Sequence, residues 1–458
     1  MESSKIESLS NIKNVHFIGI GGSGMFPLAH ILKEKGFNVS GSDIYESDTL
    51  QQVRSLGIEV FNEHSANNVQ GKDLVVFSAA IKEENPEIKA AKAAGIPIIE
   101  RSVMLGLIFN KYEHSIGVSG THGKTTTTSM ITSILIDADK NPTALIGATL
   151  KKIGGNSCVG NSDIMVTEAC EYVDSFLQLF PKISVITNIE ADHLDYFGTL
   201  ENVVKSFKKY ALQTSQIVVA NGDSEIVRNA TTNLPAETLY FGLSEDNEYY
   251  AKNIRYNAMQ QASFDIFHQS NNVAHVDLSI PGKHNIYNSL AAYIVCEKSG
   301  ISSKTFEKSI KDFTGAHRRF EVLLKKDGIT IVDDFAHHPT EIKTTLSAAS
   351  KMGFKRVWAI FQPHTFSRTF MFQNEFAEAL SIADEVVISD ILPVRETNTY
   401  GVESTDITNK IKGSHYIPTF EEISEFIVKS VQPGDLVITL GGGNIYKCAN
   451  MIVDKLSI

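Results

Sequence analysis

A glycine-rich loop between a predicted strand and a predicted helix constrains this chain more than any other segment. The apolar residues 116–119 predict a strand that runs directly into Gly120-Thr121-His122-Gly123-Lys124-Thr125, and further threonines open a helix. Glycines let backbone N–H groups turn inward toward a phosphate, and the helix N-terminus adds partial positive charge. A lysine and a threonine in this register bind the outer phosphates and Mg²⁺. The segment therefore predicts an α/β domain that binds ATP.

The loop departs from the usual phosphate-loop pattern at one position, because Val118 stands where a further glycine is common. A glycine-rich turn before a threonine-capped helix is the structural alternative. Glycine, lysine and threonine in register after a strand favour phosphate binding over that alternative. The candidate nucleotide-binding residues of this segment are Gly120, Thr121, His122, Gly123, Lys124, Thr125 and Thr126.

The rhythm of strands and helices indicates three α/β domains. The chain has 458 residues, more than one hydrophobic core usually holds. From the first predicted strand (15–20) onward, strands alternate with helices, which is typical of parallel, doubly wound sheets. Residues 236–280 show strand patterns alone and predict a small antiparallel patch. We expect a Rossmann-like N-terminal domain (1–114), a central P-loop-type ATPase domain with the antiparallel patch (115–316) and a Rossmann-like C-terminal domain (317–458).

Composition excludes several classes of protein. The formal net charge of -11 argues against a nucleic-acid-binding surface, which needs a basic stripe. No stretch approaches the roughly 18 apolar residues of a membrane span, and the polar N-terminus lacks the pattern of a signal peptide. The four cysteines have no CxxC spacing and are typical of reduced thiols. We therefore expect a cytoplasmic protein without a nucleic-acid or membrane partner.

A second glycine-rich loop, residues 19–24, follows the first predicted strand. Its sequence Gly-Ile-Gly-Gly-Ser-Gly fits G-x-G-x-x-G, and Asp43 closes the second predicted strand at the distance typical of the dinucleotide fingerprint. Taken alone, the pattern indicates NAD, and a tight turn with close helix packing is the structural alternative. Nucleotides other than NAD present the same diphosphate, so the loop predicts a diphosphate at a helix N-terminus.

Acidic residues follow two strands of the predicted central sheet. Glu168 and Glu171 follow the strand 164–167. His193 follows the strand 183–188, among aspartates. Because the carboxyl ends of parallel strands share one edge of a sheet, these residues should lie near the phosphate loop. Carboxylates there can bind Mg²⁺, or Mn²⁺ in its place. His193 is either a ligand of a second metal ion or a solvated loop residue.

Polar residues also gather at strand ends in the predicted C-terminal domain. Four segments there combine arginine, aspartate, histidine and glutamate side chains: 316–321, 333–339, 362–368 and 390–396. One such segment is an ordinary surface loop, but four together favour a polar site that faces the phosphate loop. Before them, the spacing of Asn285 and Asn288 leaves open whether this segment only caps a helix or also contacts an adenine edge.

Five strings together resemble the Mur ligases of bacterial peptidoglycan synthesis, and the resemblance covers residues 19–443. The strings are Gly-Thr-His-Gly-Lys-Thr-Thr-Thr-Thr (120–128), Thr-Asn-Ile-Glu-Ala-Asp-His-Leu-Asp (187–195), Gly-Ala-His-Arg-Arg-Phe-Glu (315–321), Asp-Asp-Phe-Ala-His-His-Pro-Thr-Glu (333–341) and Gln-Pro-His-Thr-Phe-Ser-Arg (362–368). The resemblance implies a three-domain ligase that uses ATP and Mg²⁺ to activate a carboxylate as an acyl phosphate. The strings are most similar to the alanine-adding branch, which implies UDP-N-acetylmuramate and L-alanine as substrates and a monomer or weak homodimer.

The resemblance also implies roles for single residues. The UDP part of the substrate would lie against Gly19, Gly21, Gly22, Gly24, Asp43 and Ser78. Besides the phosphate loop, ATP would contact His284, Asn288, Arg319, Asp334 and His337. Metal ions would be held by Thr125, Glu168 and His193. The amino acid would lie near His364, Arg368, Asp390 and Arg395. The catalytic residues would be Lys124, Glu168, His193 and Arg319.

Alternatives exist inside and outside this family. Residues 168–174 read Glu-Ala-Cys-Glu-Tyr-Val-Asp, where the family usually has Glu-Ala-Asp-Glu-Ser-Asp, although Glu168 and Glu171 are kept. Inside the superfamily, a ligase that recycles whole peptides and a folate polyglutamylation enzyme are the rivals. Outside it, the rivals are an NAD-dependent oxidoreductase and a non-catalytic nucleotide-binding regulator. The sequence does not distinguish alanine from glycine or serine, which differ little in a small pocket.

Overall fold

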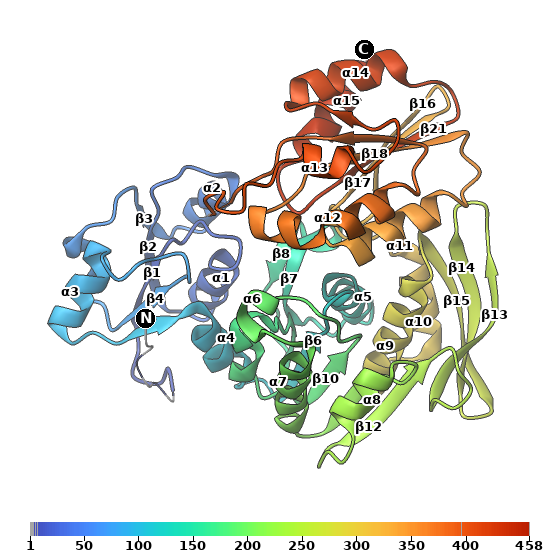
Figure 1. Cartoon of the computed structure of the whole chain (residues 1–458). Coiled ribbons are helices and arrows are strands. Elements are labelled where there is room, and N and C mark those ends of the chain that lie inside the picture. The colour runs from blue at the N-terminus through green and yellow to red at the C-terminus, as the bar shows by residue number, and fades with distance from the viewer. Residues whose placement is uncertain (1–3, 5, 7, 395, 458) are drawn as a thin grey trace. The chain divides into compact units, whose positions relative to one another are not determined.

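The computed structural model describes residues 4, 6, 8–394 and 396–457, and the chain divides into two compact units (Figure 1). The first unit comprises Met1–Tyr250 and Tyr287–Phe306, and the second comprises Ala251–Ile286 and Glu307–Ile458. Across the described residues, no helix is both long enough and apolar enough to span a bilayer.

The first unit opens with a parallel five-stranded sheet in the order β3-β2-β1-β4-β5. Its strands are β1 (Asn14–Ile18), β2 (Asn38–Ser42), β3 (Glu59–Phe61), β4 (Leu74–Phe77) and β5 (Ile98–Glu100). Its helices are α1 (Phe26–Glu34), α2 (Asp48–Ser55), α3 (Pro86–Ala94) and α4 (Arg101–Phe109). The winding direction changes at β1, which pairs with both β2 and β4. Ligands bind at such a switch point, so the glycine-rich loop after β1 is well placed to hold one.

The glycine-rich loop is longer than the sequence predicted. The strand β1 ends at Ile18 and not at Ile20, because Gly19 adopts a φ of 79° and turns the chain. The helix α1 begins at Phe26. Residues 19–25 therefore form an irregular loop between β1 and α1.

The central sheet of the first unit has the strand order β12-β11-β10-β6-β9-β7-β8. Its strands are β6 (His114–Ser119), β7 (Thr143–Leu150), β8 (Gly155–Cys158), β9 (Ile164–Glu168), β10 (Ile183–Ile186), β11 (Ile217–Asn221) and β12 (Glu237–Gly242). Its helices are α5 (Lys124–Asp137), α6 (Leu194–Phe197), α7 (Leu200–Leu212) and α8 (Glu225–Thr231). Later in the chain, α9 (His284–Lys298) begins in the second unit and continues in the first, and α10 (Ser303–Asp312) begins in the first unit and continues in the second. The strand β6 leads into the phosphate loop and lies between β9 and β10, so all three strand ends meet at one edge.

The predicted antiparallel patch is confirmed. The strands β13 (Tyr249–Tyr256), β14 (Gln261–His268) and β15 (Asn271–Pro281) are consecutive in the sheet, and β14 and β15 form an antiparallel hairpin. Alternate residues of β14 are buried, which is the period-two pattern that the sequence showed.

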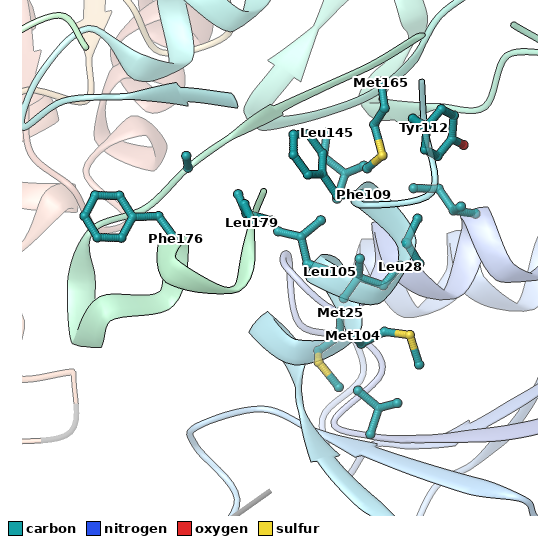
Figure 2. Packing of buried hydrophobic residues seen from close by; sticks show 14 of the residues in the cluster. Met25, Leu28, Met104, Leu105, Phe109, Tyr112, Leu145, Met165, Phe176 and Leu179 are labelled. Atoms are coloured by element: carbon teal, nitrogen blue, oxygen red, sulfur yellow. The ribbon is translucent and has the colours of Figure 1, made fainter. Parts of the chain in front are cut away.

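One hydrophobic core joins the N-terminal sheet to the central sheet within the first unit (Figure 2). Met104, Leu105 and Phe109 of α4 belong to the same buried cluster as Leu145 of β7 and Met165 of β9. The backbone is equally close, since a Cβ on Gly106 would lie 2.5 Å from the carbonyl oxygen of Gln178. The two glycine-rich loops therefore belong to one packed body.

The C-terminal sheet of the second unit has the order β16-β17-β21-β18-β19-β20, with β16 antiparallel to β17 and the other pairs parallel. Its strands are β16 (Glu321–Lys326), β17 (Ile329–Asp334), β18 (Arg356–Phe361), β19 (Glu385–Ile388), β20 (His415–Tyr416) and β21 (Asp435–Leu440). Its helices are α11 (Pro339–Ala349), α12 (Phe366–Leu380), α13 (Thr405–Thr408), α14 (Phe420–Ser430) and α15 (Tyr446–Ser457). Separate cores against α11 and α12 and against α14 and α15 show that helices cover both faces (Figure 1). The α/β class is confirmed, and the boundaries at 114/115 and 316/317 stay predictions.

Candidate active site

The phosphate loop is held open by the segment that follows β10. The Thr121 N–H donates to the Asn188 carbonyl at 3.1 Å, and the His122 N–H donates to Oδ1 of Asn188 at 2.8 Å. Thr187 donates its hydroxyl to the His122 carbonyl at 2.6 Å. The sequence placed Thr187 and Asn188 within a strand, but β10 ends at Ile186 and these residues brace the loop. Gly120 and its neighbours therefore keep a fixed shape.

Both glycines of the loop are required by its geometry. Gly120 has a φ of 140° and Gly123 a φ of 84°, values that other residues rarely adopt. A Cβ on Gly120 would lie 2.0 Å from Oγ1 of Thr187. A Cβ on Gly123 would lie 2.7 Å from Oδ1 of Asn288. Gly123 is also the residue before α5, so the loop opens onto a helix N-terminus as the sequence predicted.

Lys124 lies in a buried ion pair with Glu171. Its Nζ donates to Oε2 of Glu171 at 2.9 Å and to Oε1 at 3.1 Å, and also to the carbonyl of Thr121 at 3.1 Å. Burial disfavours the charged amine, but the carboxylate of Glu171 outweighs burial and the pKa of Lys124 is raised. The sequence predicted Glu171 only as an acidic residue near the loop, and in the structure it is the partner of the loop lysine.

Two oxygen groups suited to a divalent cation lie beside this loop. Glu168 ends β9 next to Val118 of β6, and its Oε1 accepts a hydrogen bond from the Gly147 N–H. Neither Oε2 of Glu168 nor the hydroxyl of Thr125 has a hydrogen-bond partner among the described residues. One carboxylate and one hydroxyl match the few protein ligands that Mg²⁺ usually takes beside a nucleotide. Among the described residues, no group of three or more acidic, histidine or cysteine side chains could hold a metal ion unaided.

His193 is positioned by an aromatic neighbour. It follows β10 in a left-handed conformation with a φ of 53°, and its ring centroid lies 4.7 Å from that of Tyr172. Its backbone N–H donates to Oδ1 of Asp192 at 2.8 Å. Tyr172 directly follows Glu171, which pairs with Lys124. One short segment therefore contacts both His193 and Lys124.

Asn288 braces the phosphate-loop helix. Its side chain is 3% exposed, and its Oδ1 accepts a hydrogen bond from Thr127 of α5 at 3.2 Å. The contact of Asn288 with adenine stays a prediction. Thr126, the third residue of α5, is also buried. His284 is exposed and belongs to the second unit, where a Cβ on Gly282 would lie 2.5 Å from its ring.

The N-terminal glycine loop is organised by Asp43. Oδ2 of Asp43 accepts from the Gly21 N–H at 2.9 Å, and Oδ1 accepts from the Tyr45 N–H at 3.1 Å. Gly19 lies next to Ser78, whose Oγ would be 3.7 Å from a Cβ on that glycine. Gly22 continues the turn, since its N–H donates to the Gly19 carbonyl at 3.1 Å. Asp43 after β2 and Ser78 after β4 thus lie beside the glycine loop, and their binding of UDP stays a prediction.

In the second unit, Arg319 and Asp334 lie at the end of β17. Nε of Arg319 is buried without a hydrogen-bond partner among the described residues, and its guanidinium lies 5.1 Å from the ring centroid of Phe335. Asp334 is 7% exposed and accepts hydrogen bonds from the Ala336 N–H at 2.8 Å and the Phe320 N–H at 3.1 Å. Burial raises the pKa of Asp334 to about 6, although the charge of Arg319 opposes that rise.

Two histidines lie beside each other in the same unit. The rings of His337 and His364 have centroids 6.0 Å apart. Burial lowers the pKa of His337 to about 4, and the positive charge of Arg368 adds to this shift, so His337 is neutral near pH 7. Burial also lowers the pKa of His364, whose Nδ1 has no partner within the described part of the chain. Thr365, the N-cap of α12, has a strained φ of 66°.

The remaining residues of the expected amino-acid site follow β19. Asp390 is exposed and accepts a hydrogen bond from the Tyr416 hydroxyl at 2.5 Å, a contact that the sequence gave no signal for. Backbone hydrogen bonds between the segments that hold His364 and Asp390 bring them together, with Thr365 N–H donating to the Leu392 carbonyl at 2.9 Å. Arg395 lies outside the described residues.

Comparisons with known proteins identify the fold and the family. Residues 14–113 match the "Mur ligase family, catalytic domain", residues 118–296 the "Mur ligase middle domain" and residues 318–443 the "Mur ligase, glutamate ligase domain". The UDP-N-acetylmuramate–L-alanine ligase of Caldicellulosiruptor saccharolyticus is 45% identical, over 96% of this chain and 98% of the relative. The chain belongs to the Mur ligase family. A Mur ligase of the same description from Caldanaerobacter subterraneus subsp. tengcongensis is 44% identical over 98% of each chain.

Among solved structures, the UDP-N-acetylmuramate-alanine ligase of Thermotoga maritima has a TM-score of 0.82 and 28% identity, covering 97% of this chain and 99% of its own. A murein peptide ligase from Psychrobacter arcticus has a TM-score of 0.72 at 24% identity, which shows a shared fold. The predicted three-domain architecture and the resemblance to Mur ligases are thereby confirmed. As a member of this family, the chain is an ATP-dependent ligase.

Proposed function

We propose that this Mur ligase joins L-alanine to the carboxylate of UDP-N-acetylmuramate, with ATP converted to ADP and phosphate. The observation that carries the proposal is the full-length similarity to alanine ligases, 45% over 96% of the chain, together with a braced phosphate loop around Lys124. The glycine loop organised by Asp43 lies in the same packed unit and suits the diphosphate of the UDP moiety.

The first chemical step forms an acyl phosphate. A carboxylate oxygen of the muramic acid attacks the γ-phosphorus of ATP, the bond to the β–γ bridging oxygen breaks, and ADP leaves. Lys124 and the loop N–H groups would stabilise the charge on the phosphate oxygens. Arg319 would approach the same phosphate, and its buried Nε–H, which has no partner among the described residues, supports this role. Thr125 and Glu168 would hold Mg²⁺, with His193 holding a second ion; the metal supplies charge neutralisation when bound.

The second step forms the amide. The alanine amine attacks the acyl carbon, phosphate leaves, and the nitrogen loses a proton to the surroundings. Asp390 could pair with the ammonium group of the incoming alanine, while Arg368 and Arg395 could hold its carboxylate. Neutral His337 and His364 line this region without adding charge. The adenine contacts proposed for His284 and Asn288 would fix the nucleotide.

The test is phosphate release from ATP with UDP-N-acetylmuramate and a panel of amino acids, with the product identified by mass spectrometry. We expect release to require both UDP-N-acetylmuramate and an amino acid, with L-alanine the most effective. Release stimulated by a tripeptide and not by any free amino acid would instead favour a peptide-recycling ligase. Release without stimulation by any acceptor would refute the ligase assignment for this site.

A further inference from the structure

Arg101 stands at the first position of α4. It directly follows β5, its side chain is half-buried, and it makes no hydrogen bond or ion pair with any residue that the structure describes. The first turn of α4 contains no acidic residue, and the preceding Glu100 uses Oε2 to accept the Ser102 N–H at 2.8 Å. A cation at the positive end of a helix is unfavourable unless an anion joins it.

The side chain of Arg101 lies against the N-terminal glycine loop. A Cβ on Gly24 would lie 3.2 Å from Cδ, 3.4 Å from Nε and 3.5 Å from NH1 of Arg101. The third glycine of a G-x-G-x-x-G loop normally allows close packing of a helix on the sheet. Here that glycine leaves room for an arginine, so Gly24 and Arg101 act as one structural element.

Arg101 also acts electrostatically on the segment beside the phosphate loop. Burial raises the pKa of the Cys170 thiol and the charge of Glu171 adds to this rise, whereas the positive charges of Lys124 and Arg101 oppose it. The glycine loop is fixed to the central sheet on this side, because Nδ2 of Asn156 donates to the Ser23 carbonyl at 3.1 Å. The guanidinium therefore lies against a glycine loop that is itself attached to the central sheet.

We propose that Arg101 binds an anionic group of the UDP-linked substrate above the glycine loop. This inference rests on the proposed function and adds a binding residue to the same site. A guanidinium donates two parallel hydrogen bonds to a phosphate or a carboxylate, and it keeps its charge at any working pH. The UDP-linked substrate carries both chemistries, in its diphosphate and in the carboxylate of its muramic acid.

The experiment measures binding of UDP-N-acetylmuramate and of UDP-N-acetylglucosamine to the full chain by calorimetry. The second ligand has the same diphosphate and lacks the carboxylate. We expect Arg101→Met to weaken UDP-N-acetylmuramate at least tenfold and Arg101→Lys to weaken it less, with the affinity for ATP unchanged. Lys92→Met, which removes an exposed cation of α3 paired with Glu83 at 3.6 Å, is the matched control and should bind both ligands normally.

The outcomes separate the two anions and the two proposals. Equal loss for both ligands assigns Arg101 to the diphosphate, and loss for UDP-N-acetylmuramate alone assigns it to the carboxylate. Wild-type affinity in Arg101→Met, when the unmodified protein binds UDP-N-acetylmuramate, overturns the inference. No binding by the unmodified protein would refute the proposed function instead.

Gly24→Ala supplies an independent test. If the added methyl group acts by displacing the guanidinium, Gly24→Ala weakens the same ligands, and the double variant with Arg101→Met is no weaker than Arg101→Met alone. Additive losses would show that Gly24 acts without Arg101. Unchanged ATP affinity in each variant shows that the first unit is folded. A KM that rises for the UDP substrate but not for ATP shows a specific loss of substrate binding and not a general structural defect.

Discussion

Replacing Asp333 with asparagine should destabilise the second unit strongly. Asp333 is 1% exposed, and its Oδ2 accepts a hydrogen bond from Nε of Arg318 at 2.7 Å. The other guanidinium nitrogens of Arg318 donate to the carbonyls of Gly441 and Gly443, each at 2.7 Å. Asp333→Asn keeps the shape of the side chain but leaves a buried guanidinium without its carboxylate.

The expected loss in the free energy of unfolding depends on the hydrogen bonds that Arg318 keeps. Removing one partner of a buried ion pair typically costs 3–5 kcal/mol, and the two carbonyls still solvate the guanidinium, so we expect about 3 kcal/mol. Trp358 is the single tryptophan of the chain, lies in β18 and is 3% exposed. Its fluorescence therefore reports unfolding of the second unit alone. With a urea dependence of about 3 kcal/mol per molar, the midpoint should fall by about 1 M.

The control is Glu378→Gln, which breaks the exposed pair between Glu378 and Lys343 of the same unit. Exposed pairs contribute about 0–1 kcal/mol, so its midpoint should stay within about 0.3 M of the unmodified protein. A midpoint for Asp333→Asn that equals that of Glu378→Gln would refute the reasoning, since it would mean that Arg318 tolerates the loss of its carboxylate.

Three further predictions concern the nucleotide site and the second unit. Lys124→Met should lower kcat at least about a hundredfold in the phosphate-release assay, because it removes charge at the transferring phosphate. Gly123→Ala should weaken ATP about tenfold by calorimetry, since its φ of 84° alone costs roughly 1–2 kcal/mol; Gly36→Ala, with a φ of 85° and open space around it, should bind ATP normally. The pKa of Asp334 is raised to about 6, so this group stabilises the folded state at low pH, and that stabilisation is lost as the pH rises through 6. The pKa of His337 is lowered to about 4, so this group stabilises the folded state at higher pH, and that stabilisation is lost as the pH falls through 4. The two effects oppose each other, so His337→Gln should reveal a urea midpoint that falls from pH 4 to 6, and a flat profile would contradict the assignment.

Much of the fold could be predicted because it depends on local pattern. Buried strands such as β6 and β9 lead directly into a glycine-rich loop or an acidic segment, and the sequence located both of them. The strands that it missed are short or exposed, such as β3 and β20, or variable in burial, such as β7. Their pairing depends on neighbours distant in the chain, which one sequence does not display.

The candidate site was predictable where motif residues are contiguous and less so where contacts are distant. The loop around Lys124 followed from its own spacing, but the pairing of Lys124 with Glu171 depends on the fold of the segment after β9. The role of Asn188 depends on where β10 ends, and Arg101 carries no motif of its own. A guanidinium is recognised as a binding group only when its surroundings show that no protein carboxylate neutralises it.

The core that α4 shares with the central sheet has a consequence for recombination between relatives. Cutting the chain between the N-terminal and central sheets would expose Leu105 and Phe109, which are buried against Leu145 and Met165 in the intact unit (Figure 2). Each excised half would then carry an apolar surface that invites aggregation. A chimaera with another Mur ligase should therefore exchange the segment up to Tyr250 together with residues Tyr287–Phe306, so that both glycine-rich loops keep the contacts that space them.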